Sequence, residues 1–372
     1  NAQQESPPPV GLRNQGNTCY LNSLLQTIYA APDFRDAVAN AGAGRRGGVF
    51  QALQTVFSDL NAGGGGGGRG ASTAPLTSAM RVDVRVQQDA HEFGRFLLMN
   101  IEAEAEDGAA PAGAVTAVRR LFVGQLANFL SCVDVPFEKE WKEDFFDVSL
   151  DVKGCRDLKA ALNRYTEPEL LSGENRWKTA SHGLQDALKG VRFLALPPVL
   201  QFHLKRFEYD PYSDNMAKLN DRFEFPAELD VSPWLEADPA TIAADAGEGM
   251  GGVGSISGGS SRYHLNAVLM HVGGPLAGHY FAYVRRAAAE ALGGTAVAAA
   301  AGGGSSQWFR VDDDRVAAVS EADVLRDAYG GGGGGRTTGG RSSLLEQVLG
   351  IGAGGGTPSA YIVQYVREEG SG

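Results

Sequence analysis

Four tracts rich in glycine and alanine interrupt this chain and restrict where a folded core can form. They cover residues 62–72, 238–261, 287–306 and 330–357, and the first contains six consecutive glycines. Such sequences bury too little apolar surface to offset the entropy lost when a chain becomes ordered. We therefore expect four disordered surface insertions, with a short helix at 342–349 as one exception, and we expect the folded segments to lie between them.

Charge and cysteine content narrow the function classes. The formal net charge of −11 argues against nucleic-acid binding and suits a soluble protein or one that receives a basic partner. The odd set Cys19, Cys132 and Cys155 has no close pairing, which favours a reducing cytosolic or nuclear compartment over a disulfide scaffold. The sequence has no CxxC pair, so we expect no cysteine-based zinc site.

Two more segments bear on membrane association and on domain organisation. The alanine-rich stretch 287–301 contains Glu290 and two glycines, so it is too polar to span a bilayer, and we expect no membrane association. Residues 1–10 (NAQQESPPPV) are polar and proline-rich, as linkers are. We expect residues 11–372 to form one domain of a longer, multidomain protein.

The segment GLRNQGNTCYLNSLLQ, residues 11–26, places a cysteine where a helix begins. The apolar residues that follow have the spacing of one helix face: Leu21, Leu24, Leu25 and Ile28. Asn17 or Thr18 is expected to cap this helix through a side-chain oxygen. At a helix N-terminus the free amides and the macrodipole favour thiolate over thiol, so Cys19 is a candidate nucleophile. A buried structural cysteine is the alternative.

The rest of the pattern predicts an α+β fold. A helix is expected over 89–101, with Asp89 and Glu92 in its first turn. Its buried face is predicted to contain Phe93, Phe96, Leu97 and Ile101. Short runs rich in β-branched and aromatic residues predict strands at 193–196, 199–207, 263–272, 279–285, 308–311 and 361–367. We expect a helical N-terminal lobe against a C-terminal antiparallel sheet, with a bend at Pro197 and Pro198.

A thiolate nucleophile needs a base, and the base needs an acceptor that orients it. Among the histidines, His279 has the best context, because it follows the loop GGPLAG and opens a strand. His91, His203 and His271 are expected to be structural or surface residues. The triplet 312–314 follows an aromatic strand and offers Asp312 as the orienting residue, although a solvated turn is the simpler interpretation.

A developing oxyanion also needs hydrogen-bond donors. Asn14 lies five residues before Cys19 in the same loop, and its amide could fold back over the nucleophile. The backbone N–H of Cys19 would be the second donor.

Together these segments resemble the ubiquitin-specific proteases, a family of cysteine peptidases with papain-like chemistry. The matching segments are 11–23, 88–93 (QDAHEF), 196–200, 204–207, 278–283 and 308–314, in the order of that family. The resemblance implies a papain-like fold with a helical thumb at about 11–118, fingers at about 119–192 and a palm at about 193–372. The segments 183–191, 207–211 and 220–226 are most similar to the herpesvirus-associated subgroup.

The resemblance also implies residue roles. Cys19 would be the nucleophile, His279 the general base and acid, Asp312 the orienting residue with Asp313 as an alternative, and Asn14 the oxyanion donor. The residues implied to bind the basic tail of ubiquitin are Asp89, Glu92, Arg206, Phe207, Tyr209, Lys218 and Tyr280. No cofactor or metal is implied, because Cys132 and Cys155 stand alone in the fingers.

The activity implied is hydrolysis of the isopeptide bond between ubiquitin's terminal glycine and a lysine. The partners would be ubiquitin and ubiquitinated proteins, met by a monomeric catalytic domain in the nucleus or cytoplasm. Two alternatives remain open at this point. One is a catalytically inactive ubiquitin-binding domain, and the other is a protease for another ubiquitin-like modifier.

Overall fold

The computed structural model describes residues 9–63, 70–212, 214–235, 260–275, 278–286, 306–331 and 357–368. The interiors of the four glycine- and alanine-rich tracts, the expected helix at 342–349 and most of the expected linker lie outside these ranges. One edge of the first tract differs from the prediction. Ala71 is buried and pairs with Leu12, so it packs against the loop that precedes Cys19 instead of extending into solvent.

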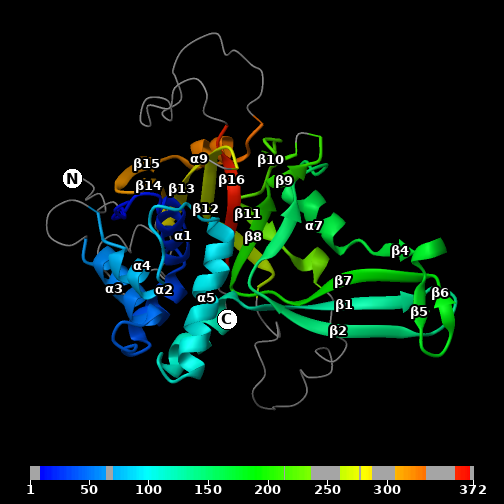
Figure 1. The fold of residues 1–372 in the computed structure, drawn as a ribbon. Helices are drawn as coiled ribbons and strands as arrows, with labels where there is room; N and C mark the ends of the chain where they lie inside the picture. The colour runs from blue at the N-terminus through cyan, green and yellow to red at the C-terminus, as the bar shows by residue number, and fades with distance from the viewer. Residues whose placement is uncertain are drawn as a thin grey trace, which may run out of the picture.

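The N-terminal lobe is helical, as predicted, and lies on the left in Figure 1. Its helices are α1 (Cys19–Tyr29), α2 (Pro32–Asn40), α3 (Val49–Asn61), α4 (Ala74–Ala79), α5 (Ala90–Glu106) and α6 (Ala112–Phe122). Their apolar faces share one core that also takes in Leu269, Tyr280 and Tyr361 from the sheet. Helix α1 is buried along its whole length, so it lies at the centre of the contact between helices and sheet.

Helix α1 begins at Cys19 as predicted, but the prediction of a side-chain cap was wrong. Thr18 occupies the N-cap position without a capping hydrogen bond from its side chain. Its Oγ1 instead accepts a 3.0 Å bond from the Gln15 amide, and Asn17 Nδ2 donates to the Arg85 carbonyl at 2.5 Å. Both side chains therefore stabilise the loops next to the helix. The helix itself is stabilised by the burial of its side chains.

Helix α5 begins one residue later than predicted, so Asp89 is its N-cap: the Asp89 carboxylate accepts bonds from the amides of His91 (2.8 Å) and Glu92 (3.0 Å). The buried face differs from the prediction at one position. Phe93, Leu97 and Ile101 are buried, but Phe96 is 51% exposed. Leu98 takes its place because the neighbouring helices pack on that side of α5.

The C-terminal lobe is built on an eight-stranded sheet whose main path runs in the order β15-β14-β13-β12-β16-β8-β3. These strands are β3 (Val148–Asp151), β8 (Val199–Lys205), β12 (Arg262–Gly273), β13 (Gly278–Arg286), β14 (Gln307–Asp312), β15 (Arg315–Val319) and β16 (Ser359–Arg367). The eighth, β11 (Glu228–Asp230), pairs with β12. Neighbours are antiparallel except β3 and β8, so the predicted antiparallel sheet is present.

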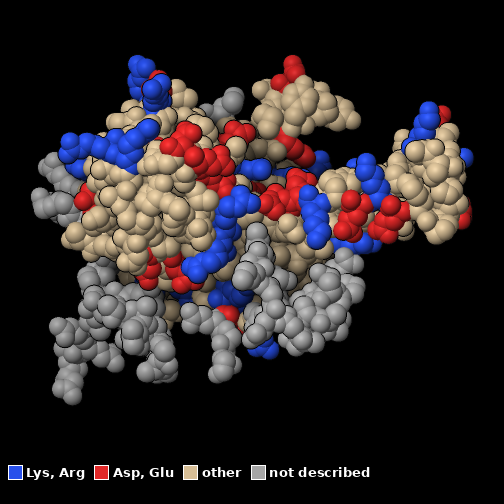
Figure 2. Space-filling view, turned by 90° about the horizontal axis from the view of Figure 1, so that it is seen from below, with Lys and Arg blue, Asp and Glu red and all other residues tan. Residues whose placement is uncertain are grey.

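A second sheet forms the arm that extends to the right in Figure 1. Its order is β2 (Glu138–Phe145), β1 (Gly124–Cys132), β7 (Ala187–Ala195) and β4 (Glu169–Leu171). The predicted bend at Pro197 and Pro198 separates β7 in this arm from β8 in the main sheet. Acidic and basic side chains are interspersed along the exposed strand β2, and both signs appear along the arm in Figure 2.

The far end of the arm holds the small hairpin β5 (Trp177–Thr179) and β6 (Gly183–Gln185). The Phe137 ring contacts the rings of Trp177 and His182, with centroids 5.3 and 5.5 Å away. Aromatic packing therefore fastens this end. The remaining elements are α7 (Leu158–Thr166), β9 (Phe207–Asp210), β10 (Asn215–Lys218), α9 (Glu321–Ala328) and two short 3₁₀ turns at Gly173–Asn175 and Ser232–Trp234.

Candidate active site

The fold brings Cys19, His279 and Asp312 together from three neighbouring elements. Cys19 is the first residue of α1, which packs on β13. His279 is the second residue of β13, and Asp312 ends β14, the next strand of the sheet. His279 Nε2 lies 2.6 Å from Asp312 Oδ1, and Cys19 is close enough to the imidazole to raise its pKa. The histidine thus interacts with both the cysteine and the aspartate.

The electrostatics of this group favour an ion pair. Burial disfavours a charge on His279, but its interactions with Asp312 and Cys19 raise its pKa to about 10. Burial opposes charge on Asp312 as well, yet His279 and Arg310 together hold the pKa of that carboxyl below its usual range. Arg310 donates a 2.6 Å bond to Asp312 Oδ2, so both carboxylate oxygens are engaged.

This pKa shift predicts how stability depends on pH. His279 has a pKa of about 10 in the folded chain against 6.5 for the free side chain, so the folded state binds more protons between these values. The resulting stabilisation, on the order of a few kcal/mol, is complete below pH 6.5 and lost as the pH rises through about 10. Urea unfolding of wild type and His279→Gln should show a difference that shrinks over this range. A difference constant with pH would contradict the ion pair.

Asp313 holds the loop before the nucleophile. Its backbone lies in the left-handed region at φ 52°, and its carboxylate accepts 2.8 Å bonds from both Asn14 Nδ2 and Asn22 Nδ2. Its carbonyl accepts a 2.8 Å bond from the Leu12 amide. A Cβ at Gly11 would lie 2.6 Å from that same carbonyl, so the approach requires glycine there. Asp313 therefore contacts the cysteine loop, whereas the partner of His279 is Asp312.

Asn14 lies in the loop before Cys19, as predicted. Both the oxygen and the nitrogen of its side-chain amide form hydrogen bonds. Its Oδ1 accepts bonds from the Gly16 amide at 2.9 Å and the Thr18 amide at 3.2 Å. Its Nδ2 donates one hydrogen to Asp313 at 2.8 Å, and an amide nitrogen carries two hydrogens. The structure thus fixes the side chain beside the start of α1.

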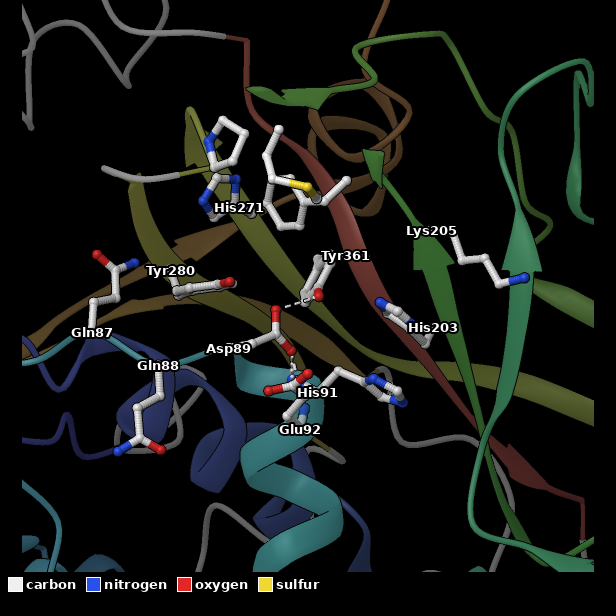
Figure 3. A pocket seen from close by; sticks show the side chains of 13 residues that line it. Gln87, Gln88, Asp89, His91, Glu92, His203, Lys205, His271, Tyr280 and Tyr361 are labelled. Carbon is white, nitrogen blue, oxygen red and sulfur yellow. Dashed lines mark hydrogen bonds between the residues drawn. The ribbon is translucent and has the colours of Figure 1, made fainter. Parts of the chain in front are cut away.

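A cleft of about 380 Å³ lies between α5 and the strands β8 and β9, and its lining includes Tyr280, the residue after His279 (Figure 3). Its lining includes four of the predicted tail-binding residues: Asp89, Glu92, Phe207 and Tyr280. Asp89 also accepts a hydrogen bond from the Tyr361 hydroxyl, drawn as a dashed line in Figure 3. One wall of the cleft is therefore acidic and another is aromatic.

Three histidines expected to be structural or surface residues also line this cleft: His91, His203 and His271. The rings of His91 and His203 stack with centroids 3.8 Å apart, and His91 Nε2 bonds to Asp147 at 2.7 Å. Burial lowers the pKa of His203 and of His271 to about 3, so both are neutral. Their place in the wall depends on the pairing of β8, β12 and β16, which sequence spacing does not reveal.

Arg206 corrects the sequence analysis. The family resemblance implies that Arg206 binds the ubiquitin tail, but its side chain is fully buried. Its guanidinium donates to the carbonyls of Ala360 (2.7 Å), Leu219 (3.0 Å) and Asp221 (2.9 Å). These hydrogen bonds link β16 to the segment after β10. Because the guanidinium is buried among these carbonyls, it cannot contact a ligand in the cleft.

Lys218 and Tyr209 also lie outside the cleft lining. Lys218 Nζ donates to the carbonyls of His271 (2.8 Å) and Thr357 (3.3 Å), and burial lowers its pKa to about 7. Tyr209 is 57% exposed on β9, and its hydroxyl bonds to Asp214. The predicted tail-binding set thus divides into four cleft residues and three that face elsewhere.

Replacement of Arg206 should affect stability rather than binding. We expect Arg206→Met to lower the free energy of unfolding by about 3 kcal/mol, because three buried carbonyls lose their donor. Lys205→Met is the matched control: its exposed side chain pairs with Asp151, and its loss should cost about 0.5 kcal/mol or less. Urea unfolding measures both. An unchanged stability with a raised KM would restore Arg206 to the substrate site.

Three further features concern metal binding, the cysteines and membrane spans. Among the described residues, the side chains that could together hold a metal ion are His279, Asp312 and Asp313, and the contacts above account for their proximity. All three cysteines are free and buried. Within the same part of the chain, no helix has the length and apolar character needed to cross a membrane.

Comparison with known proteins then decides the family. The family model described as ubiquitin carboxyl-terminal hydrolase matches residues 10–365. The chain belongs to the ubiquitin carboxyl-terminal hydrolase family. It is 37% identical over 328 residues to ubiquitin C-terminal hydrolase 12 of Arabidopsis thaliana, covering 86% of this chain and 26% of that protein. Ubiquitin carboxyl-terminal hydrolase 15 of Schizosaccharomyces pombe is 36% identical, with 86% and 25% covered.

The fold agrees with this family. A solved structure described as the SAGA Ubp8/Sgf11/Sus1/Sgf73 DUB module bound to ubiquitin aldehyde matches with a TM-score of 0.70. The match covers 99% of this chain and 71% of that chain at 22% identity, so it supports the fold. The predicted α+β, papain-like fold class is therefore confirmed. The chain spans about a quarter of the length of the hydrolases from Arabidopsis and fission yeast.

Proposed function

We propose that this chain is a thiol-dependent deubiquitinase that hydrolyses the isopeptide bond between ubiquitin's C-terminal glycine and a lysine. The observation that carries the proposal is the grouping of Cys19, His279 and Asp312, with His279 bonded to Asp312 at 2.6 Å and influenced electrostatically by Cys19. Membership of the hydrolase family and the acidic cleft beside this group support it.

The proposed reaction uses each member of the group in turn. The Cys19 thiolate attacks the carbonyl carbon of the terminal glycine, and the electron pair of the C=O bond moves to oxygen. As the tetrahedral intermediate collapses, the C–N bond breaks and protonated His279 gives its proton to the departing lysine amine. Neutral His279 then takes a proton from water, the water oxygen attacks the thioester, and Cys19 leaves as thiolate. Asp312 keeps His279 oriented and stabilises its charged form.

The oxyanion formed in both steps requires donors near Cys19. The amide of Cys19 is the first of α1 and has no acceptor within the helix. The second hydrogen of Asn14 Nδ2 is the proposed partner donor, with Asp313 holding that side chain in place.

The cleft accounts for the choice of a basic, glycine-ended tail. Asp89 and Glu92 provide the acidic wall that would receive arginine side chains. The Tyr280 and Tyr361 rings pack against each other with centroids 5.8 Å apart, and these bulky side chains line the cleft and restrict its width. Residues without side chains suit such a passage, which is the basis for expecting glycine next to the scissile bond.

We also place the chain in the herpesvirus-associated subgroup of these proteases. The support is the similarity of segments 183–191, 207–211 and 220–226 to that subgroup. Under this proposal the domain is a monomeric part of a longer protein that acts on ubiquitinated proteins in the nucleus or cytoplasm. Three free cysteines agree with a reducing compartment.

The function is tested with ubiquitin that carries an electrophilic group at its C-terminus. We expect a covalent adduct by intact mass, with the added mass on the peptide that contains Cys19. Ubiquitin binding without an adduct would instead identify an inactive ubiquitin-binding domain. Reaction with the corresponding probe of another ubiquitin-like modifier, and none with ubiquitin, would reassign the substrate.

A further inference from the structure

Strand β15 leaves one edge of the main sheet open. It is the last strand in the sheet order and pairs with β14, and no strand in the described part of the chain lies on its other side. Its sequence, RVAAV, has a single charge at Arg315, and the four residues that follow are uncharged and small or β-branched. Ala317 and Ala318 are exposed. An edge of this kind can pair with another extended chain.

The other three terminal strands of the two large sheets are protected against such pairing. Six of the eight residues of β2 are charged, and β4 has three residues. At the opposite end of the main sheet, β3 packs against α7. Charge, shortness and a covering helix are the usual means of preventing strand addition at an edge. Strand β15 has none of them over residues 316–319, which makes its edge a candidate docking site.

The hairpin that contains β15 determines which backbone groups face outward. Asp312 and Arg315 pair across a two-residue turn, and the residues that flank such a turn bond to each other through their backbones. Bonded and non-bonded pairs then alternate along an antiparallel ladder. Ala317 therefore bonds to β14, while the N–H and C=O groups of Val316 and Ala318 point away from it. These outward groups are available to a further strand.

The cleft approaches β15 through consecutive strands of the sheet. Its lining includes one residue from each of four neighbouring strands: His203 of β8, Tyr361 of β16, His271 of β12 and Tyr280 of β13. His279 lies on β13 and Asp312 on β14, so the order continues through the catalytic group to β15. A ubiquitin tail that follows this order ends at His279, and the lysine side of the bond then lies toward β14 and β15. Figure 1 shows β15 at the edge of the sheet that faces away from the arm.

We propose that the outer edge of β15 binds, as an added strand, the extended polypeptide segment that flanks the lysine from which ubiquitin is removed. This inference rests on the proposed function. An added strand would lie three strand spacings, about 14 Å, from β13. The lysine side chain and two or three extended residues, at about 3.4 Å each, cover that distance. The docked residues are therefore a few positions away from the lysine and are recognised mainly through their backbone.

Hydrogen exchange tests the docking without requiring catalysis. The ligand is ubiquitin joined by an isopeptide bond to the central lysine of a peptide of about 13 residues rich in valine and threonine, which favour strands. With the Cys19→Ala chain, we expect this conjugate to slow exchange of the Val316 and Ala318 amides about fivefold or more, and free ubiquitin to have no such effect. The Ala317 amide is the internal control, because it already bonds to β14. Unchanged exchange at Val316 and Ala318 overturns the inference.

Kinetics test the same contact from both sides. A second conjugate carries the same peptide with alternate backbone nitrogens methylated, and we expect its kcat/KM with the wild-type chain to be about tenfold lower. Ala318→Pro removes an outward N–H and should lower kcat/KM for the unmethylated conjugate by a similar factor, with no change for a ubiquitin–fluorophore substrate. Ala318→Ser keeps the N–H and is the matched control. Equal rates on the two conjugates overturn the inference even if Ala318→Pro does not fold, and so does an equal loss on the fluorophore substrate.

The remaining outcomes distinguish this inference from the proposed function. If the wild-type chain hydrolyses no ubiquitin substrate while the conjugate still slows exchange in β15, the proposed activity fails and the docking site stands. If both conjugates are hydrolysed at equal rates, the activity stands and the docking site fails. If sedimentation shows a dimer of the wild-type chain that Ala318→Pro dissociates, the edge pairs two copies of this chain and the inference is wrong.

Discussion

Cys19→Ala should abolish hydrolysis while ubiquitin still binds. Alanine has no atom that can form the thioester, so we expect kcat/KM for a ubiquitin–fluorophore substrate to fall by about 10⁶-fold, the scale seen when a protease loses its nucleophile. Cys19 is only 5% exposed, but alanine differs from it by a single sulfur atom, so we expect the change to remove few other contacts. Fluorescence kinetics and the electrophilic probe measure the loss, and isothermal titration measures the retained binding.

The other two cysteines provide matched controls. Cys132 and Cys155 are also free and buried, but Cys132 ends β1 in the arm and Cys155 packs in the core near α7. Cys132→Ala and Cys155→Ala should keep nearly full turnover and form the adduct. Loss of the adduct in either control, with Cys19→Ala still reactive, would move the nucleophile to another place in the fold.

Asp312→Asn should reduce kcat by about 10³- to 10⁴-fold with little change in the affinity for ubiquitin. An asparagine cannot stabilise the charged imidazole of His279, and its amide would present a donor where Nε2 now meets an acceptor at 2.6 Å. Asp312 is buried away from the cleft lining, so ubiquitin keeps its contacts. Single-turnover kinetics and titration on the same preparations measure the two effects.

Neighbouring aspartates test whether this effect is specific. Asp314 is exposed, and Asp314→Asn should behave like the wild type. Asp313→Asn should disturb the Asn14 and Asn22 contacts but leave the His279–Asp312 pair in place. Equal activity in Asp312→Asn with a large loss in Asp313→Asn would transfer the orienting role to Asp313. Arg310 loses its charged partner in Asp312→Asn, so unfolding curves must accompany the kinetics.

The amino-acid sequence determined the features that depend on near neighbours in the chain. The apolar spacing after Cys19 places the start of α1, the acidic residues Asp89 and Glu92 mark the start of α5, and the paired prolines separate two strands. Each of these follows from backbone geometry over a few residues, which is why periodicity and residue type are enough to find them. The order of the motifs along the chain was likewise enough to indicate the family.

Other features depend on contacts between distant residues, and only the tertiary structure decided them. Asn14 meets Asp313 across 299 residues of sequence, which gives Asp313 a role in the cysteine loop. Arg206 belongs to the same segment as Phe207, yet it faces the interior while Phe207 faces the cleft. Phe96 fits a helical apolar pattern but remains exposed. The physical reason is that burial and hydrogen bonding depend on which surfaces the packed elements cover, and spacing along one element does not contain that information.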